Sequence, residues 1–543
     1  MNKISKISKN NKSKLIAATL KPTSALTAFL CLVGAWLYYT GAPVFWAGFA
    51  AIMFFYILIF FVGAYSEHLY KSSDNSEVLV AGRTIPLAIS VFTMSATWID
   101  GGYVNGTAEY TASSGLAWVQ APWCYAISLI IGGLFFARTM RRYRFRTMLD
   151  PLAQRFGERN AALLFIPALL GETFWTAAIL TALGTTFATI LNLDFNTAIL
   201  LSAFIGIAYT SMGGLWAVAL TDVVQLLFLF FGLYLIIPFI LPHVGGLDHL
   251  IEQYQAQKGE LAQFFPPLKG WQSEAWGNSY FLWWDYAFLL IFGGIPWQVY
   301  FQRVLSAKDE NTAVRLSVLS GVVCLLAAIP PIIIGMVGAT VNWADAGVPP
   351  PESTVLTLPY VIRYLSNPVV ATIGLGAVAA AVMSSVDASI LSASSMASWN
   401  VYRPLINPNL SDKTLSKVLK RCVWIVGIAA TIMALKVKSV YALWLLCSDL
   451  VYCILFPQLA TALFDPKANR HGSTAGLWVA LILRIGGGEA TLGIPNFLPY
   501  PMVENGVVLF PFRTLSMLCG LLTILVVSRL TQHLSPPNKL QQM

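Results

Sequence analysis

Residues able to bind an ion or an organic cation lie inside the most apolar stretches of this 543-residue chain. Asp100 stands beside two glycines, and Ser384 and Ser385 stand in a run of small residues. A charge in the hydrocarbon core of a bilayer is costly and marks a functional site by default. Six acids lie inside or at the edges of such stretches: Asp100, Glu172, Asp222, Asp285, Asp387 and Asp449.

The densest polar patch begins at Ala381. At 100° per residue, the carbonyl of Ala381 and the hydroxyls of Ser384 and Ser385 share one side of a helix. Such oxygens suit a hard cation, and the carbonyls of Ala96 and Ile99, beside a helix break, would complete the shell. The alternative is that the serines pack helices closely and hydrogen-bond across them.

Three tryptophans, Trp98, Trp175 and Trp297, lie in the middle of apolar stretches rather than at their ends. Trp and Tyr at bilayer interfaces act as anchors, but mid-span rings beside a broken helix are suited to line a ligand site. Several ring faces around one point would hold a quaternary ammonium by cation–π attraction, worth about 0.5–2 kcal/mol per ring. The alternative is plain packing of large apolar groups.

The composition states which elements must position these groups. Hydrophobic types make up 57% of the chain and charged types 11%, against about 25% charged residues in soluble domains. This excludes an ordinary soluble enzyme, a disordered scaffold and a disulfide-stapled module, and predicts an all-α polytopic membrane protein. The net charge of +9 does not indicate nucleic acid, because the basic residues occupy short loops between apolar runs. The seven cysteines lie in apolar runs and are interpreted as core residues.

A membrane-crossing helix needs about 20 apolar residues. This length predicts about fourteen spans, and the runs lack the alternation of a β-barrel. The first run, 25–39, is interpreted as an uncleaved span; a cleaved signal peptide is the alternative. The predicted spans are centred near residues 33, 55, 98, 128, 175, 202, 230, 290, 327, 385, 428, 452, 480 and 520.

Basic residues predict the orientation, because Lys and Arg gather in cytoplasmic loops. Residues 1–23 hold six lysines, and seven arginines lie between Arg138 and Arg159. With fourteen spans, the basic loops fall on one side, apart from Lys436 and Lys438 in an outer turn. We therefore predict cytoplasmic N- and C-termini and a plasma-membrane location, which is the inner membrane if the source is bacterial.

Two spans are interrupted, one at Asp100-Gly101-Gly102 and one at Gly293-Gly294-Ile295-Pro296. Each break opens a five-span block, and the two blocks have opposite orientations. Paired breaks in inverted halves point to the midplane site of a secondary transporter. The predicted organisation is a basic tail 1–23, two accessory helices and a loop 24–85, a first repeat 86–242, an outer loop 243–278, a second repeat 279–465, and two C-terminal helices with a tail 466–543.

Several motifs resemble the sodium/solute symporter family and, within it, the high-affinity choline transporters. The family motif is Gly-Gly-Leu-Trp-Ala-Val-Ala-Leu-Thr-Asp-Val-Val-Gln from Gly213. The more specific motifs are Ala-Thr-Trp from Ala96, Gly-Gly-Tyr-Val-Asn-Gly-Thr-Ala-Glu from Gly101, Leu-Leu-Gly-Glu from Leu169, Gly-Gly-Ile-Pro-Trp-Gln from Gly293, Ala-Val-Met-Ser-Ser from Ala381 and Ser-Asp-Leu-Val-Tyr from Ser448. The resemblance runs from about residue 56 to residue 530.

The resemblance implies a five-plus-five inverted-repeat core of the LeuT type that works by alternating access. It implies sodium bound by the carbonyls of Ala96 and Ile99 and by Ala381, Ser384 and Ser385. It also implies a choline cage made by Trp98, Tyr125, Trp175 and Trp297. Chloride dependence is known in the animal relatives, and no motif here decides it.

Asp100 departs from the animal pattern, which has glycine at this position. We hypothesise that its carboxylate strengthens binding of a cationic substrate or replaces chloride as the fixed negative charge. Asp222 and Asp387 are candidates for a second cation site, and a structural hydrogen-bonded pair is the alternative.

The expected function is therefore import of choline, or a closely related quaternary amine, by sodium symport. The alternatives are betaine, carnitine, another amine or an amino acid as cargo; a sugar is disfavoured because the site is aromatic. A ligand sensor on a symporter core would carry a signalling domain. A membrane enzyme would need a cofactor motif or a cluster of His or Cys, and the five histidines are scattered. The expected partners are the amine and the lipid bilayer, and the oligomeric state stays open.

Overall fold

A computed structural model describes residues 9–41, 43–69, 80, 83, 85–211, 215–409, 411–437 and 439–543. Residues 1–8, most of the predicted 66–85 loop and the first glycines of the motif at Gly213 lie outside this set. The α-helices are α1 Lys9–Tyr39, α2 Trp46–Leu69, α3 Leu87–Trp98, α4 Gly101–Ser113, α5 Ala121–Ile131, α6 Arg138–Arg142, α7 Asp150–Phe156, α8 Glu158–Leu191, α9 Phe195–Thr210, α10 Leu215–Ile240, α11 Leu247–Lys258, α12 Ser279–Gly293, α13 Gln298–Ser306, α14 Glu310–Thr340, α15 Thr357–Tyr364, α16 Pro368–Met396, α17 Arg403–Leu405, α18 Asp412–Lys436, α19 Val440–Leu450, α20 Phe456–Phe464, α21 Arg470–Gly486 and α22 Phe512–Leu530.

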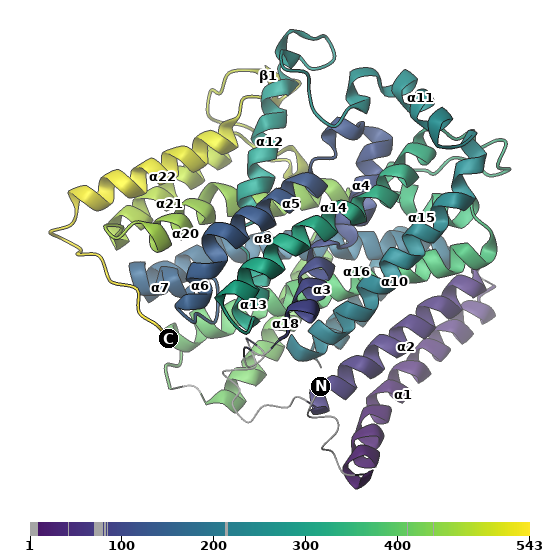
Figure 1. The fold of residues 1–543 in the computed structure, drawn as a ribbon, viewed down its shortest axis with the longest axis horizontal. Helices are drawn as coiled ribbons and strands as arrows, with labels where there is room; N and C mark the ends of the chain where they lie inside the picture. Colours follow the sequence, from purple (N-terminus) through teal and green to yellow (C-terminus); the bar gives the residue numbers. More distant parts are fainter. Residues whose placement is uncertain are drawn as a thin grey trace.

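Short segments complete the architecture. Three π-helical segments, Gly132–Ala137, Ala397–Tyr402 and Val451–Leu455, extend α5, α16 and α19. Two strands, β1 Val503–Glu504 and β2 Val507–Val508, form an antiparallel hairpin. The long helices run roughly alongside one another (Figure 1), with the α1–α2 pair at one edge of the bundle and α21 and α22 at the opposite edge. Both pairs flank the helices that hold the candidate site.

The apolar helices bear out a polytopic membrane protein. Within the described residues, eight helical segments are long and apolar enough to cross a membrane, and four shorter apolar helices accompany them. Each of the fourteen predicted span centres falls in a helical segment. Large apolar side chains such as Phe135, Leu227 and Ile425 face outward from these helices, as expected of residues that meet lipid. The number of crossings and the inverted repeat stay predictions.

Both predicted helix interruptions are present. Helix α3 ends at Trp98, and α4 begins at Gly101 after Ile99 and Asp100 leave the helical conformation. Helix α12 ends at Gly293, and α13 begins only at Gln298. Glycine weakens a helix, and proline has no N–H to continue the hydrogen-bond ladder. Local residue chemistry therefore sets both breaks.

Arginine-rich segments that are far apart in sequence meet at one end of the bundle. The Arg141 guanidinium donates to the carbonyl of Ala307 at 2.8 Å. Arg146 and Arg403 both lie over the ring of Trp399, at 4.7 and 4.4 Å from its centroid. These contacts join the basic segments around residues 141, 307 and 403, which the sequence assigns to one side of the membrane.

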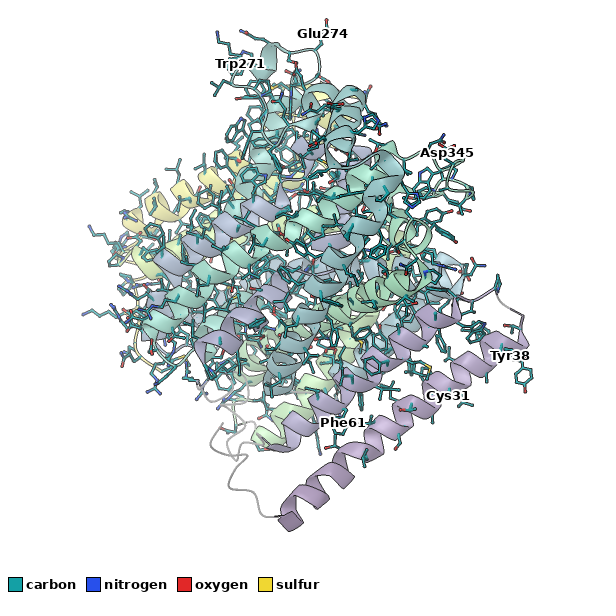
Figure 2. The ribbon with its side chains drawn as sticks, turned by 45° about the vertical axis from the view of Figure 1, so that its right-hand side comes forward. Cys31, Tyr38, Phe61, Trp271, Glu274 and Asp345 are labelled. Carbon is teal, nitrogen blue, oxygen red and sulfur yellow. The ribbon has the colours of Figure 1, made fainter. Side chains whose placement is uncertain are left out.

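The last residues of the chain lie at this same end. The Met543 N–H donates to the carbonyl of Tyr143 at 3.0 Å, and Arg155 donates to the carbonyl of Asn538 at 2.5 Å. Trp271 and Glu274, in the predicted outer loop, project from another part of the molecule (Figure 2). The C-terminal segment and the arginine-rich segment therefore share one side, as predicted.

The C-terminal helices are held to the core by a buried charge cluster. Asp449 on α19 accepts from Arg484 of α21 at 2.6 Å and from Arg513 of α22 at 2.9 Å. Arg484 also pairs with Glu489 at 2.6 Å, and Arg513 lies 3.7 Å from Asp285 on α12. These pairings give Asp285 and Asp449 a structural role in joining α21 and α22 to α12 and α19.

Candidate functional site

Aromatic rings from four separate parts of the chain meet beside the two helix breaks. Trp98 ends α3, Tyr125 lies on α5, Trp175 lies on α8, and Trp297 immediately precedes α13. Together with Val299, Trp444 and Cys447, these four residues line one small pocket. The structure thus brings together all four rings that the sequence analysis assigns to a cation cage.

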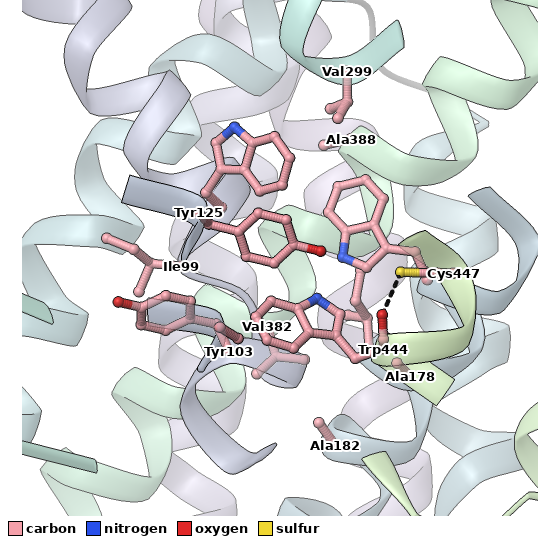
Figure 3. Packing of buried hydrophobic residues seen from close by; sticks show 14 of the residues in the cluster. Ile99, Tyr103, Tyr125, Ala178, Ala182, Val299, Val382, Ala388, Trp444 and Cys447 are labelled. Carbon is pink, nitrogen blue, oxygen red and sulfur yellow. Dashed lines mark hydrogen bonds between the residues drawn. The ribbon is translucent and has the colours of Figure 1, made fainter. Parts of the chain in front are cut away.

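The rings form two linked groups. The ring centroids of Trp98 and Tyr125 are 4.8 Å apart, and Tyr125 is also 4.8 Å from Trp444. Trp175 and Trp297 meet edge to face at 5.6 Å and 72°. Figure 3 shows Tyr125 and Trp444 in this packing, close to Cys447. Such spacings are typical of favourable aromatic contacts.

The pocket among the rings is small in this structure, with a volume of about 10 Å³. A volume of this size holds about one water molecule. The rings therefore contact one another across the space where a quaternary ammonium would lie. Binding of such a cation requires the rings to move apart and exchange ring–ring contacts for ring–cation contacts.

Hydrogen bonds fix three of the four rings. The Tyr125 hydroxyl bonds Ser448 at 2.5 Å, and the Trp297 indole N–H donates to the carbonyl of Gly293 at 2.6 Å. The Trp175 indole N–H donates to the Asp100 carboxylate. Within the described part of the chain, the buried Trp98 indole N–H has no partner. A buried donor without a partner is costly, so Trp98 could donate to a polar group of a bound molecule.

Asp100 lies at the first helix break and contacts the cage. One of its carboxylate oxygens accepts the backbone N–H of Tyr103 at 2.6 Å and thereby caps α4. The other oxygen accepts the indole N–H of Trp175. The side chain is buried. The predicted proximity of this acid to the substrate site is therefore present, through Trp175.

The predicted sodium ligands lie where α16 packs against the same break. The Ser385 hydroxyl is 3.4 Å from the carbonyl of Ala96, so one ion could reach both oxygens. Ser384 donates to Asp222 on α10, one helix away from the break. Ile99 and Ala381 are buried nearby on the α3–α4 break and on α16. The structure brings Ala96 and Ser385 together and gives Ser384 a different partner.

Asp222 and Asp387 have different surroundings. Asp222 accepts from Thr93 and lies 3.6 Å from Arg303. Asp387 accepts from Thr210 at 2.6 Å. In the regions that the structure describes, neither acid is seen to hydrogen-bond the other, and only Asp222 pairs with a basic side chain. Asp387 is the better candidate for a cation, because Arg303 already neutralises Asp222.

A larger cavity lies near the outer end of α4. Its volume is about 210 Å³, and its walls include Tyr110, Trp118, Tyr286 and Tyr441. Tyr110 and Tyr441 stack with ring centroids 3.8 Å apart, and Tyr441 in turn is 5.7 Å from Trp444. Aromatic residues therefore form a continuous contact from this cavity to the cage.

Three participants in the site were missed by sequence reasoning. Trp444 and Cys447 line the cage from α19, and Arg303 supplies the charge that faces Asp222. Trp444 precedes the quoted motif at Ser448 by one helical turn, which places both on one side of α19. That spacing could have indicated Trp444. An arginine in a predominantly apolar stretch could have indicated Arg303.

Comparison with known proteins now identifies the class. The family model described as the sodium:solute symporter family matches residues 79–480. The chain belongs to this family. High-affinity choline transporter 1 of Caenorhabditis elegans is 45% identical over 513 residues, which cover 91% of this chain and 87% of that protein. The human high affinity choline transporter 1 is 45% identical over 504 residues, which cover 90% and 85%.

Solved structures agree on the fold. A Na⁺-coupled sialic acid symporter in a substrate-bound outward-open state matches with a TM-score of 0.75 at 20% identity, covering 92% of this chain and 99% of that one. A nucleobase-cation-symport-1 family transporter in a closed conformation matches with a TM-score of 0.53 at 13% identity, covering 84% and 95%. The fold is therefore that of sodium-coupled symporters.

Proposed function

We propose that this protein imports choline, or a closely related quaternary amine, by sodium symport through alternating access. The observation that carries the proposal is the aromatic cage of Trp98, Tyr125, Trp175 and Trp297 beside two broken helices. Ring faces suit a cation that has no N–H to donate. The relatives at 45% identity over most of the chain, which are named choline transporters, support the same cargo.

Sodium binds, in this proposal, between the first helix break and α16. The carbonyls of Ala96 and Ile99 and the oxygens of Ala381, Ser384 and Ser385 provide the ligands. The 3.4 Å separation of the Ser385 hydroxyl and the Ala96 carbonyl supports a shared ion. Ser384 would leave Asp222 to join the shell. Sodium then ties α16 to α3 and preorganises the cage, so the ion gradient drives accumulation of the amine.

A second cation would bind at Asp387, with Asp222 in its vicinity. The lack of a basic partner for Asp387 among the described residues supports this assignment, since a buried carboxylate gains from a cation. Chloride is a possible co-substrate, as the sequence analysis noted, and Asp100 is the fixed charge that could stand in its place.

The proposed topology has about fourteen spans built on two inverted five-helix repeats, with both termini in the cytoplasm. The meeting of the arginine-rich segments and the C-terminal residues at one end supports this orientation. The proposed location is the plasma membrane, or the inner membrane of a bacterium. A cationic substrate then gains about 2.3 kcal/mol per 100 mV from a negative interior.

The test is uptake of labelled choline into proteoliposomes that contain the purified protein. An inward sodium gradient is compared with an equal potassium gradient, and Trp297→Ala is compared with the unaltered protein. We expect uptake that requires sodium and falls by at least about tenfold in the variant, since loss of one ring face and its packing exceeds 1.4 kcal/mol. Sodium-independent uptake, or unchanged uptake in Trp297→Ala, would contradict the proposal.

The alternative cargoes are betaine, carnitine and amino acids, all of which carry a carboxylate. The buried carboxylate of Asp100 behind Trp175 disfavours them by repulsion. Competition of each compound against labelled choline in the same vesicles measures this preference directly.

A further inference from the structure

Asp100 is a buried acid whose charge is not neutralised by a basic side chain within the described residues. Two other buried acids are paired: Asp222 lies against Arg303, and Asp449 lies against Arg484. An unpaired charge away from water is costly, and it is retained in membrane proteins where it serves function. The surroundings of Asp100 therefore favour a cation that comes from outside the chain.

The carboxylate is held in its anionic form by hydrogen-bond donors. One oxygen accepts from the backbone N–H of Tyr103, at the start of α4, and the other accepts from the indole of Trp175. The N-terminal end of a helix carries partial positive charge and stabilises an anion. Both oxygens accept from N–H groups, so neither needs a proton of its own.

The indole of Trp175 connects this charge to the cage. Its N–H points to Asp100, while its ring meets Trp297 edge to face and lines the pocket. A hydrogen bond to an ionised acceptor is short and strong, so it fixes the ring orientation. It also draws the N–H proton toward the carboxylate, which increases the negative charge on the ring face. Cation–π attraction grows with that charge.

Building on the proposed function, we infer that Asp100 is a positioning residue that acts through Trp175 to make the cage selective for net charge. The cage then prefers a full cation such as choline over a neutral molecule of the same shape and over a zwitterion such as betaine. The indole that Asp100 orients and polarises distinguishes the first pair. Repulsion between Asp100 and the ligand carboxylate adds to the second preference.

The test compares the unaltered protein with Asp100→Asn in sodium-driven uptake. Asparagine keeps an oxygen that can cap α4 and accept from Trp175, but it removes the charge. Three compounds compete with labelled choline: choline itself, betaine, and the neutral carbon analogue of choline with a tert-butyl group in place of the trimethylammonium. We expect choline to bind about tenfold more weakly to the variant, within the range of one altered cation–π contact. Binding of the neutral analogue should be unchanged, and betaine should gain relative to choline.

A second variant tests the route through the indole. Trp175→Phe keeps an aromatic ring and removes the N–H that Asp100 accepts. In this background, Asp100→Asn should change choline affinity by much less than tenfold, because residues in contact give non-additive effects. Equal effects of Asp100→Asn in both backgrounds would overturn the role of Trp175.

Two other outcomes would also overturn the inference. If the neutral analogue weakens as much as choline does, Asp100 only supports the fold of the site. If the sodium concentration for half-maximal uptake shifts equally with every substrate, Asp100 serves the ion. Glu109→Gln is the matched control, because Glu109 is buried on the same helix but bonds Ser439 instead of a cage ring. It should leave the ratio of choline to neutral-analogue binding unchanged.

The same vesicles separate failure of this inference from failure of the proposed function. If the unaltered protein shows no sodium-driven choline uptake, the proposed function is wrong. If it transports choline and Asp100→Asn leaves the selectivity unchanged, only the inference about Asp100 is wrong.

Discussion

Neutralising Asp449 should destabilise the protein more than any surface ion pair could. Asp449 is buried and accepts hydrogen bonds from Arg484 at 2.6 Å and from Arg513 at 2.9 Å. In Asp449→Asn, the two guanidinium groups stay buried with fewer negative partners. Breaking a buried pair by removing one partner costs about 3–5 kcal/mol. We therefore expect the free energy of unfolding to fall by about 4 kcal/mol.

The measurement is the midpoint of heat denaturation in detergent, followed by the fraction of protein that still elutes as a monodisperse peak. With an unfolding entropy of about 2.1 cal/mol/K per residue, a loss of about 4 kcal/mol over a chain of this length lowers the midpoint by roughly 3–4 °C. Asp465→Asn is the matched control. Asp465 pairs with Arg529 at 2.5 Å, but the arginine side chain is 44% exposed, and exposed pairs contribute at most about 1 kcal/mol.

The double variant Asp449→Asn with Arg484→Gln sharpens the test. Removing both charges should recover part of the lost stability, because one unpaired buried charge disappears. A midpoint for Asp449→Asn within about 1 °C of the Asp465→Asn control would refute the reasoning, since this shift corresponds to roughly 1 kcal/mol. The cluster would then contribute no more than an exposed pair.

Three further predictions concern the helix break and α16. Ser385→Ala should raise the sodium concentration for half-maximal uptake about tenfold, because it removes a proposed ligand; Ser394→Ala, whose hydroxyl bonds its own helix, should not. Equal sodium curves for the two variants would contradict the site. Asp387→Asn should lower the number of sodium ions moved per substrate, measured from reversal potentials, and an unchanged ratio would remove the second cation. Gly101→Ala should abolish most uptake at normal expression, because its Cβ would lie 2.8 Å from Val382; full activity would contradict close packing at the break.

Features set by local chemistry could be predicted from the sequence. The breaks follow from glycine and proline, and the structure ends α3 and α12 within a residue or two of the glycines that mark them. The gathering of basic segments at one end follows from the order of apolar runs and charged loops. Trp98, Trp175 and Trp297 were indicated by their mid-span positions, and the structure places all three rings in one pocket.

Long-range pairings could not be predicted in this way. Tyr125 and Ser448 are 323 residues apart in sequence and share a hydrogen bond, and nothing local to either residue indicates the other. The cost of burial made Asp449 a candidate functional acid, but its partners Arg484 and Arg513 lie 35 and 64 residues further along. Tyr125 itself came only from the family resemblance. Residues whose role depends on a distant partner therefore need the three-dimensional structure.

The small volume of the cage has a consequence for leakage. When no substrate is bound, the rings that would surround it close the space to about 10 Å³. Apolar constrictions of this kind lose their water and block ions. A sodium ion that arrives alone would meet a dry barrier, so slippage of the gradient without cargo should be slow. The faces that recognise the substrate thus also seal the path in its absence.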